Sequence, residues 1–148
     1  MPGTYTALHY HIVFATKDRS PLIHAELQPG LYDYIGGIAR SLDAVLIEIG
    51  GMPDHVHLLV RLPPKTALAD LMRVVKSRSS GWVSANHRHH LPFAWQEGYG
   101  AFAVSMSDIP KVRRYIQKQP EHHREATFRD EFQRFLDVHE ISYDAKFL

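Results

Sequence analysis

Stretches in which apolar and polar residues alternate are interspersed with stretches in which apolar residues recur every three or four positions. Alternation is typical of a half-buried strand, and the longer period is typical of an amphipathic helix. The first pattern and the flanking turn residues predict strands at Thr4–Thr16, Ala44–Gly50, His55–Leu62, Phe93–Gln96 and Ala101–Met106. The second predicts helices at His24–Leu42, Thr66–Asn86, Ser107–Gln119 and Phe128–His139.

The order of the main elements predicts the fold class. Gly50 to Asp54 is a turn by composition and makes a hairpin of the second and third strands. Pro120 should kink the third helix or end it just past Gln119. Strand, helix, strand, strand, helix, strand, helix is the split βαβ order of ferredoxin-like (RRM-like) α+β folds. We therefore expect one domain over residues 1–148, an antiparallel sheet with helices on one face, and a second face free for a ligand or partner.

Composition excludes some classes of protein but does not identify the function. The chain has 148 residues, 45% of them hydrophobic, and no apolar run near the length of a membrane span. It has no cysteine and no signal-peptide pattern at its start, so we expect a cytoplasmic protein that is not bound to a membrane. A net charge of +1 means that any nucleic-acid surface must be a local patch. The unusual value is 11 histidines, since histidine is the commonest metal ligand.

The most informative histidines are His55 and His57, two apart on a predicted strand. Side chains at this spacing share one face of a strand, so both imidazoles can reach one ion while Val56 enters the core. Two imidazoles suit a borderline divalent metal such as manganese, zinc or cobalt. His9 and His11 have the same spacing, and half-exposed strand histidines are the commoner explanation of either pair. The position of His55 after a tight turn favours the second pair.

Tyr115 and Gln119 lie four residues apart on a predicted helix and therefore share a face. A tyrosine hydroxyl can attack a phosphodiester and remain joined to the DNA as a phosphotyrosine. The amide oxygen of Gln119 can serve as a third metal ligand. Taken alone, Tyr115 also fits the ordinary role of a tyrosine on an amphipathic helix.

Five segments together resemble a known family. The segment Gly51-Met52-Pro53-Asp54-His55-Val56-His57-Leu58-Leu59 resembles the HUH signature of the single-tyrosine transposases of insertion-sequence-200-like elements, to which the REP-associated tyrosine transposases are related. In order along the chain, His11 to Lys17, Lys76 to Ser80, Trp95 to Phe102, and Tyr115 to Gln119 with His122-His123 resemble further family segments. The resemblance spans nearly the whole chain.

The resemblance implies the roles of these residues. His55, His57 and Gln119 are then the ligands of a divalent metal, Mg²⁺ or Mn²⁺, and Tyr115 on a C-terminal catalytic helix is the nucleophile. The family implies a homodimer, in which the tyrosine helix of one subunit faces the HUH pair, His55 and His57, of the other. It also implies that the substrate is single-stranded DNA with hairpins. The direct succession of Gln119 and Pro120 departs from the family pattern and puts the mobility of the tyrosine helix in question.

Basic residues predict where DNA binds. Charged contacts to phosphates give affinity and salt dependence but no sequence preference. The second helix carries three such residues, two follow the first strand, and two precede the nucleophile; these are Arg73, Lys76, Arg78, Lys17, Arg19, Arg113 and Arg114. A solvated helix face explains the first three equally well. No phosphate-binding loop is present in the sequence, so we expect no nucleotide cofactor.

The sequence leaves the roles of the remaining histidines undecided. His87, His89 and His90 can form a second metal site, although irregular spacing without cysteine favours ordinary loop residues. His122 and His123 fall near the end of the catalytic helix.

The sequence also allows three competing functions. The first is a small rolling-circle-type nickase or a relaxase, and the second is a non-catalytic protein that binds DNA or RNA hairpins. The third is a small metallohydrolase, which gives Tyr115 no role.

Overall fold

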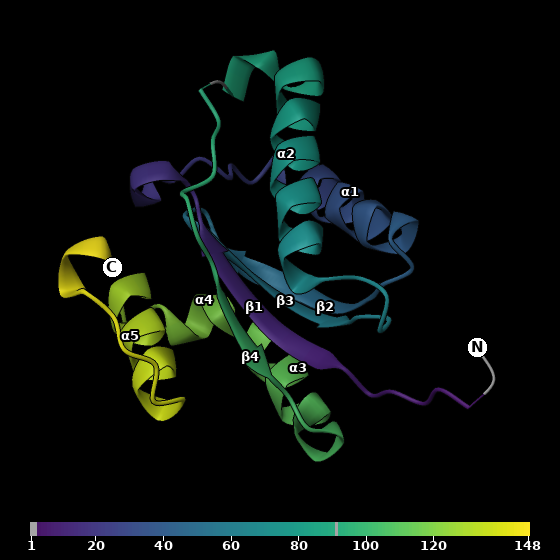
Figure 1. Cartoon of the computed structure of the whole chain (residues 1–148). Coiled ribbons are helices and arrows are strands. Elements are labelled where there is room, and N and C mark those ends of the chain that lie inside the picture. Colours follow the sequence, from purple (N-terminus) through teal and green to yellow (C-terminus); the bar gives the residue numbers. More distant parts are fainter. Residues whose placement is uncertain (1–2, 91) are drawn as a thin grey trace.

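The computed structural model describes residues 3–90 and 92–148; Met1, Pro2 and Leu91 of the expected domain lie outside the described residues. Its centre is a four-stranded sheet, which Figure 1 shows between the two groups of helices. The strands are β1 (His9–Ala15), β2 (Val45–Met52), β3 (His55–Arg61) and β4 (Gly100–Ala103). They are arranged in the order β2-β3-β1-β4, and every neighbouring pair is antiparallel. The α+β ferredoxin-like fold class is confirmed.

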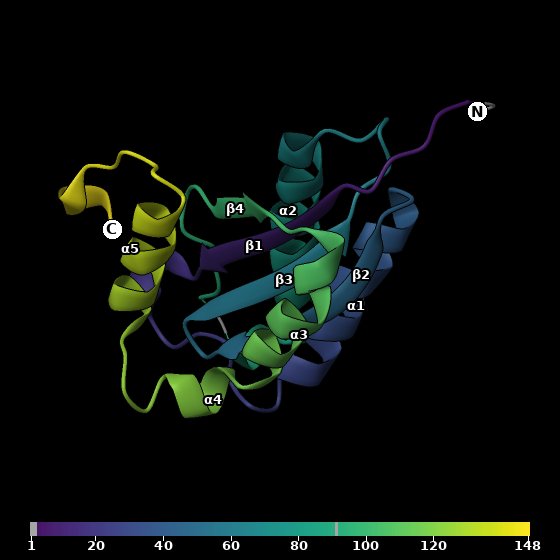
Figure 2. The ribbon, with the colours of Figure 1, turned by 90° about the horizontal axis from the view of Figure 1, so that it is seen from below.

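One face of the sheet carries α1 (Gln28–Ser41) and α2 (Leu68–Asn86), as Figures 1 and 2 show. The main core lies between these helices and the sheet. Side chains that alternate along β1 and β3 point into it, since successive residues of a strand face opposite sides. They are Ile12 and Phe14 from β1, and Val56, Leu58 and Val60 from β3. The prediction that Val56 enters the core is confirmed.

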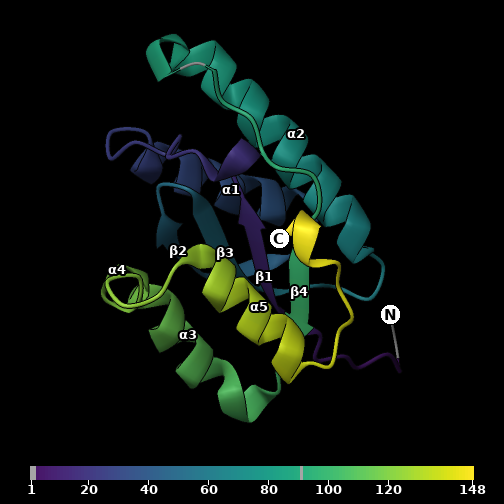
Figure 3. The same cartoon turned by 90° about the vertical axis from the view of Figure 1, so that its left-hand side faces the viewer.

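The opposite face of the sheet is covered by the C-terminal third of the chain. It carries α3 (Ile109–Gln117), α4 (Gln119–His122) and α5 (Phe128–Val138), as seen in Figure 3. Val13, Phe102 and Leu136 form a small second core under α5. The expectation that this face is free is therefore wrong for this chain, because a second apolar face on β1 and β4 is buried by α5.

The hairpin of β2 and β3 is tighter than the sequence predicts. Gly50 and Gly51 continue β2, opposite His57 and Val56, so only two residues separate the strands. At Gly50, a side chain is excluded by α3: a Cβ there would lie 2.6 Å from the carbonyl oxygen of Ile116. The glycine thus allows α3 to approach the sheet closely.

Several other predicted bounds change. Thr4 to Leu8 do not join β1, and the segment from Phe93 to Gln96 contributes only an isolated bridge between Thr16 and Trp95. The third predicted helix ends at Gln117, before Gln119 and not after it, and Pro120 then falls in the first turn of α4, where its missing N–H costs nothing. Short 3-10 turns occupy Lys17–Arg19, Arg88–His90, Met106–Asp108 and Ala145–Phe147.

Within residues 3–90 and 92–148, no helix combines the length and apolar character that crossing a bilayer requires.

Candidate active site

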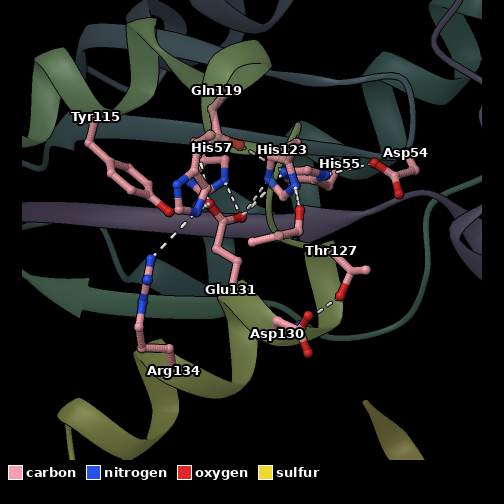
Figure 4. A network of polar contacts seen from close by, with 12 residues as sticks. Asp54, His55, His57, Tyr115, Gln119, His123, Thr127, Asp130, Glu131 and Arg134 are labelled. Carbon is pink, nitrogen blue, oxygen red and sulfur yellow. Dashed lines mark hydrogen bonds and ion pairs between the residues drawn. The ribbon is translucent and has the colours of Figure 1, made fainter.

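Side chains from β3, from the α3–α4 junction and from α5 meet on the covered face of the sheet (Figure 4). His55 and His57 point there from β3, Tyr115 from α3, Gln119 from the start of α4, and Glu131 from the first turn of α5. The histidines and Gln119 are fully buried, and Glu131 is 1% exposed. Four residues expected from the sequence are thus brought together, with one that was not expected.

His55 is held through both ring nitrogens. Its Nδ1 donates to Asp54 over 2.7 Å, and its Nε2 lies 2.9 Å from Oε1 of Gln119 and 3.4 Å from Oε1 of Glu131. Burial lowers the pKa of His55, but hydrogen bonds to Asp54, Glu131 and Gln119 outweigh it and raise the pKa to about 9. A protonated His55 donates from both ring nitrogens and so matches these three acceptors.

His57 is held by a residue of the neighbouring strand. Its Nδ1 lies 2.8 Å from Nε2 of His11, and its Nε2 lies 3.0 Å from Oε1 of Glu131. Burial, followed by the charge of His57, lowers the pKa of His11 to about 3, so His11 is neutral at physiological pH. The sequence left His11 as a strand residue; the structure makes it the outer partner of His57. Within residues 3–90 and 92–148, Nδ1 of His9 has no hydrogen-bond partner.

Glu131 is the common partner of the site. Burial raises its pKa, but hydrogen bonds from His55 and His57 outweigh this and hold the pKa of Glu131 well below its usual range. His123 also faces it, with Nε2 3.2 Å from Oε1 of Glu131 and Nδ1 2.8 Å from the carbonyl oxygen of Ala126. Glu131 therefore carries a negative charge in the most buried part of the site.

Tyr115 lies at the edge of this network. Its hydroxyl donates to Oε2 of Glu131, and its ring centroid is 5.8 Å from that of His57. Burial, then the hydrogen bond and charge of Glu131, raise the pKa of Tyr115 well above its usual value. The phenol is therefore protonated in this arrangement. All these groups belong to a single chain, so Tyr115 faces the HUH pair of its own chain.

A cavity of about 300 Å³ opens beside Tyr115. Lys111 and Arg134 contribute cationic side chains to its lining, together with Asp108. A cavity lined by a tyrosine and two cationic side chains can accept a phosphate group.

The histidines have the surroundings of metal ligands. Ligating histidines almost always use their second ring nitrogen to bind a carboxylate, a carbonyl or another polar partner. Asp54, His11 and the carbonyl of Ala126 do this for the Nδ1 atoms of His55, His57 and His123. The donor atoms of those three histidines and Glu131 all lie within 4.8 Å of one another. The residues present therefore fit a divalent cation.

Glu131 was missed by the sequence analysis, although a signal for it exists. Phe128, Phe132, Phe135 and Leu136 lie at the spacing of one apolar helix face, and Glu131 falls on that face. An acidic residue within an apolar face is expected to have a buried polar partner. The amphipathic pattern alone does not say that the partner is the HUH pair.

The basic residues proposed for DNA binding fall into separate groups. Arg73, Lys76 and Arg78 lie on α2, across the sheet from α3 with Arg113 and Arg114. The amine of Lys76 donates to the carbonyl oxygens of Gln96 and Gly98, at 2.7 and 2.6 Å, and so holds the loop before β4. Arg19 donates to a terminal oxygen of Leu148, Arg113 pairs with Glu48, and Lys17 is exposed. Their DNA contacts stay predictions.

A second histidine group lies at the far end of α2. The ring nitrogens of His87, His89 and His90 lie within 4.8 Å of one another, and the ring of His24 stacks on that of His90. Glu26 lies 3.8 Å from Nε2 of His90. The predicted loop cluster therefore exists, well separated in the fold from β3 and α5.

Known proteins resemble this chain in sequence. Residues 4–119 match the family model described as "Transposase IS200 like". The ISDra2 transposase TnpA of Deinococcus radiodurans is 28% identical over 122 residues, 79% of this chain and 87% of that protein. The transposase of insertion sequence element IS200 of Salmonella typhimurium is 27% identical over 119 residues, 76% of each chain.

Two solved structures share the fold. A crystal structure of a candidate transposase from Deinococcus radiodurans superposes with a TM-score of 0.65 at 29% identity, over 80% of this chain and 95% of that one. A REP-associated tyrosine transposase bound to a REP hairpin has a TM-score of 0.61 at 20% identity, over 83% of this chain and 73% of that one. With the family model covering most of its length, this chain belongs to the IS200-like transposase family.

Proposed function

We propose that this transposase cuts and rejoins single-stranded DNA through a covalent bond between Tyr115 and a 5′ phosphate. The observation that carries the proposal is the hydrogen-bond network around Glu131, which joins the hydroxyl of Tyr115 to the HUH pair and to Gln119 in one chain. A structural tyrosine needs no such position beside two fully buried histidines.

The chemistry is a transesterification. The oxygen of Tyr115 forms a bond to phosphorus as the bond from phosphorus to the 3′ oxygen breaks, and the phenol loses a proton while the 3′ oxygen gains one. No water and no ATP are consumed, because the phosphotyrosine keeps the energy of the broken bond. A free 3′-hydroxyl of another strand can then attack the phosphotyrosine, which rejoins the DNA and restores Tyr115.

His55, His57 and Gln119 are the residues that would hold a divalent metal, Mg²⁺ or Mn²⁺. When bound, such a cation neutralises charge on a non-bridging phosphate oxygen and makes the phosphorus more electrophilic. Asp54 and His11 orient the two histidines for this task. Tyr115 needs this help, since a phenol whose pKa is raised above its usual value stays protonated and is a weak nucleophile.

The substrate we propose is single-stranded DNA that carries hairpins. The solved REP-associated relative is bound to a REP hairpin, and the cavity beside Tyr115 offers Lys111 and Arg134 to a phosphate. We also propose a homodimer, because strand exchange requires two cleavages and each chain supplies one nucleophile. Each subunit then brings a site formed from its own residues.

The proposal is tested with labelled single-stranded oligonucleotides from the DNA that flanks the gene. Purified protein is incubated with them and Mn²⁺ or Mg²⁺, and the products are separated on a denaturing gel. We expect a metal-dependent covalent adduct that disappears in Tyr115→Phe and in His57→Ala. Oligonucleotides that bind without ever becoming attached would instead favour a non-catalytic hairpin-binding protein.

A further inference from the structure

We propose that Glu131 is itself a ligand of the metal centre, and that the same carboxylate holds the nucleophile. This inference deepens the proposed function and rests on it, because the centre is the one formed by His55 and His57. It concerns α5, which lies after the residues that match the family model.

The first argument is charge. His55, His57 and Gln119 are neutral as ligands and fully buried, so a divalent cation among them would have no compensating charge. Burying an uncompensated ion is very costly, and buried ions are therefore paired. Among the buried polar and charged side chains of residues 3–90 and 92–148, Glu131 is the only acid. It supplies one negative charge at the place where the cation would need it.

The second argument is the spacing of the donor atoms. A divalent metal bound at about 2.1 Å from each ligand places neighbouring ligand atoms about 3.0–3.4 Å apart, in octahedral or tetrahedral geometry. Oε1 of Glu131 lies 3.0 Å from Nε2 of His57, 3.4 Å from Nε2 of His55 and 3.2 Å from Nε2 of His123. These separations match the edges of such a coordination shell.

The two oxygens of the carboxylate have different partners. Oε1 faces the histidines, while Oε2 accepts from the hydroxyl of Tyr115 and, over 2.9 Å, from the amide of Gln119. One side chain therefore spans the distance between the HUH pair and the nucleophile. As a ligand through Oε1 and a positioning acceptor through Oε2, Glu131 would fix where Tyr115 stands relative to the centre.

The position of Glu131 is set by the packing of α5. Thr127 caps the helix by accepting from the backbone N–H of Asp130, and Phe128 packs on the ring of His55 with centroids 4.5 Å apart. Leu136 anchors the other end of the helix in the second core. The carboxylate is thus held by a capped and packed helix, as a metal ligand requires.

The test is the affinity of the purified protein for Mn²⁺, measured by calorimetric titration without DNA. Glu131→Gln keeps the size of the side chain and removes its charge. Asp130→Asn is the matched control, because it removes the same charge from the neighbouring, exposed residue of the same helix. His57→Ala gives the loss expected for a ligand of the HUH pair.

We expect Glu131→Gln to weaken Mn²⁺ binding about 100-fold, the upper part of the range seen when an outer partner of a metal ligand is lost. Asp130→Asn should bind as the wild type does. A loss of less than about tenfold in Glu131→Gln, or tighter binding, overturns the proposal. Circular dichroism checks folding. If Glu131→Gln does not fold, Glu131→Asp takes its place, since it keeps the charge and withdraws the carboxylate by one methylene. A loss of Mn²⁺ affinity of less than about tenfold in Glu131→Asp then overturns the proposal.

The outcome is separable from that of the proposed function. Mn²⁺ binding that depends on Glu131, in a protein that never forms a Tyr115 adduct, would support the ligand and reject the DNA chemistry. A normal Tyr115 adduct with unchanged Mn²⁺ affinity in Glu131→Gln would support the DNA chemistry and reject Glu131 as a ligand. A wild type that binds no Mn²⁺ overturns the ligand assignment directly.

Discussion

Nε2 of His11 lies 2.8 Å from Nδ1 of His57, so the first strand supports one of the two histidines of the HUH pair. The two residues are adjacent across the sheet, since Val13 of β1 pairs directly with His57 and His11 is two positions away on the same face. An imidazole in this position fixes both the orientation and the tautomer of its neighbour.

His11→Ala should therefore weaken Mn²⁺ binding by about 10- to 100-fold, the usual effect of losing the outer partner of a ligand. His9→Ala is the matched control, because His9 has the same strand spacing and is also buried, yet its Nδ1 has no hydrogen-bond partner among the described residues. The affinities are compared by calorimetry. Equal affinities in the two variants would show that His11 only fills space.

Mn²⁺ binding should become tighter as pH rises towards about 9. A metal must displace the proton of His55, whose pKa is raised to about 9, so affinity should rise about tenfold per pH unit below that value. In the protein without metal, the same raised pKa makes the free energy of unfolding fall as pH rises. Protonated His55 stabilises the fold fully below about 6.5, and this contribution is lost as pH rises through about 9.

Calorimetry at two pH values, in buffers of different ionisation enthalpy, measures the protons released on binding. Asp54→Asn should release fewer, because it weakens the hydrogen bond that raises the pKa of His55. Affinity that does not change between pH 6.5 and 8.5 would contradict the protonated state assigned to His55.

Gly50→Ala should damage the site without touching its polar residues. The added Cβ would lie 2.6 Å from the carbonyl oxygen of Ile116 and 2.9 Å from its Cγ2, so α3 must move away from the sheet. Overpacking of this kind costs about 1–3 kcal/mol of stability. A displacement of Tyr115 by about 1 Å can lower the rate of adduct formation about 100-fold.

Gly81→Ala is the control for this change. Gly81 lies in α2 with no heavy atom within 4 Å of an added Cβ, so alanine should stabilise the helix by about 0.5–1 kcal/mol and leave adduct formation unchanged. Thermal unfolding and single-turnover cleavage give the two readouts. A Gly50→Ala protein with wild-type cleavage would show that the close approach of α3 is dispensable.

Tyr115→Phe and His57→Ala should not restore each other's activity. In this structure Tyr115 and His57 of one chain face each other, with ring centroids 5.8 Å apart, so every mixed pair of subunits has one defect in each site. The two variants are co-expressed with different tags, and the doubly tagged fraction is assayed for the DNA adduct. Recovered adduct would mean that the tyrosine helix serves the partner's HUH pair.

Much of the fold could be predicted because local patterns decide it. Alternation along β1 and β3 fixes which side chains enter the main core, and the spacing of His55 and His57 places both on the other face. The glycines before the hairpin misled the prediction: Gly50 and Gly51 read as a turn by composition, whereas tertiary contact with α3 is what requires a glycine at the first of them.

The site was predicted only in part, because its remaining residues are defined by long-range packing. Tyr115 and Gln119 do meet, although the helix ends between them, because both contact the same carboxylate. Glu131 lies 74 positions from His57 along the chain, and no local pattern joins the two. Lys76 is a similar case: it was expected on a DNA surface, and two loop carbonyls bind its amine.

The central claim is that Tyr115 becomes joined to DNA, and mass spectrometry of the adduct tests it most directly. The protein is incubated with oligonucleotide and Mn²⁺, the DNA is trimmed with nuclease, and the protein is digested with trypsin. We predict that the peptide from Tyr115 to Lys118 carries a 5′-linked nucleotide on the tyrosine oxygen. A nucleotide on another residue, or no covalently linked peptide with an oligonucleotide that the protein binds, would contradict the account.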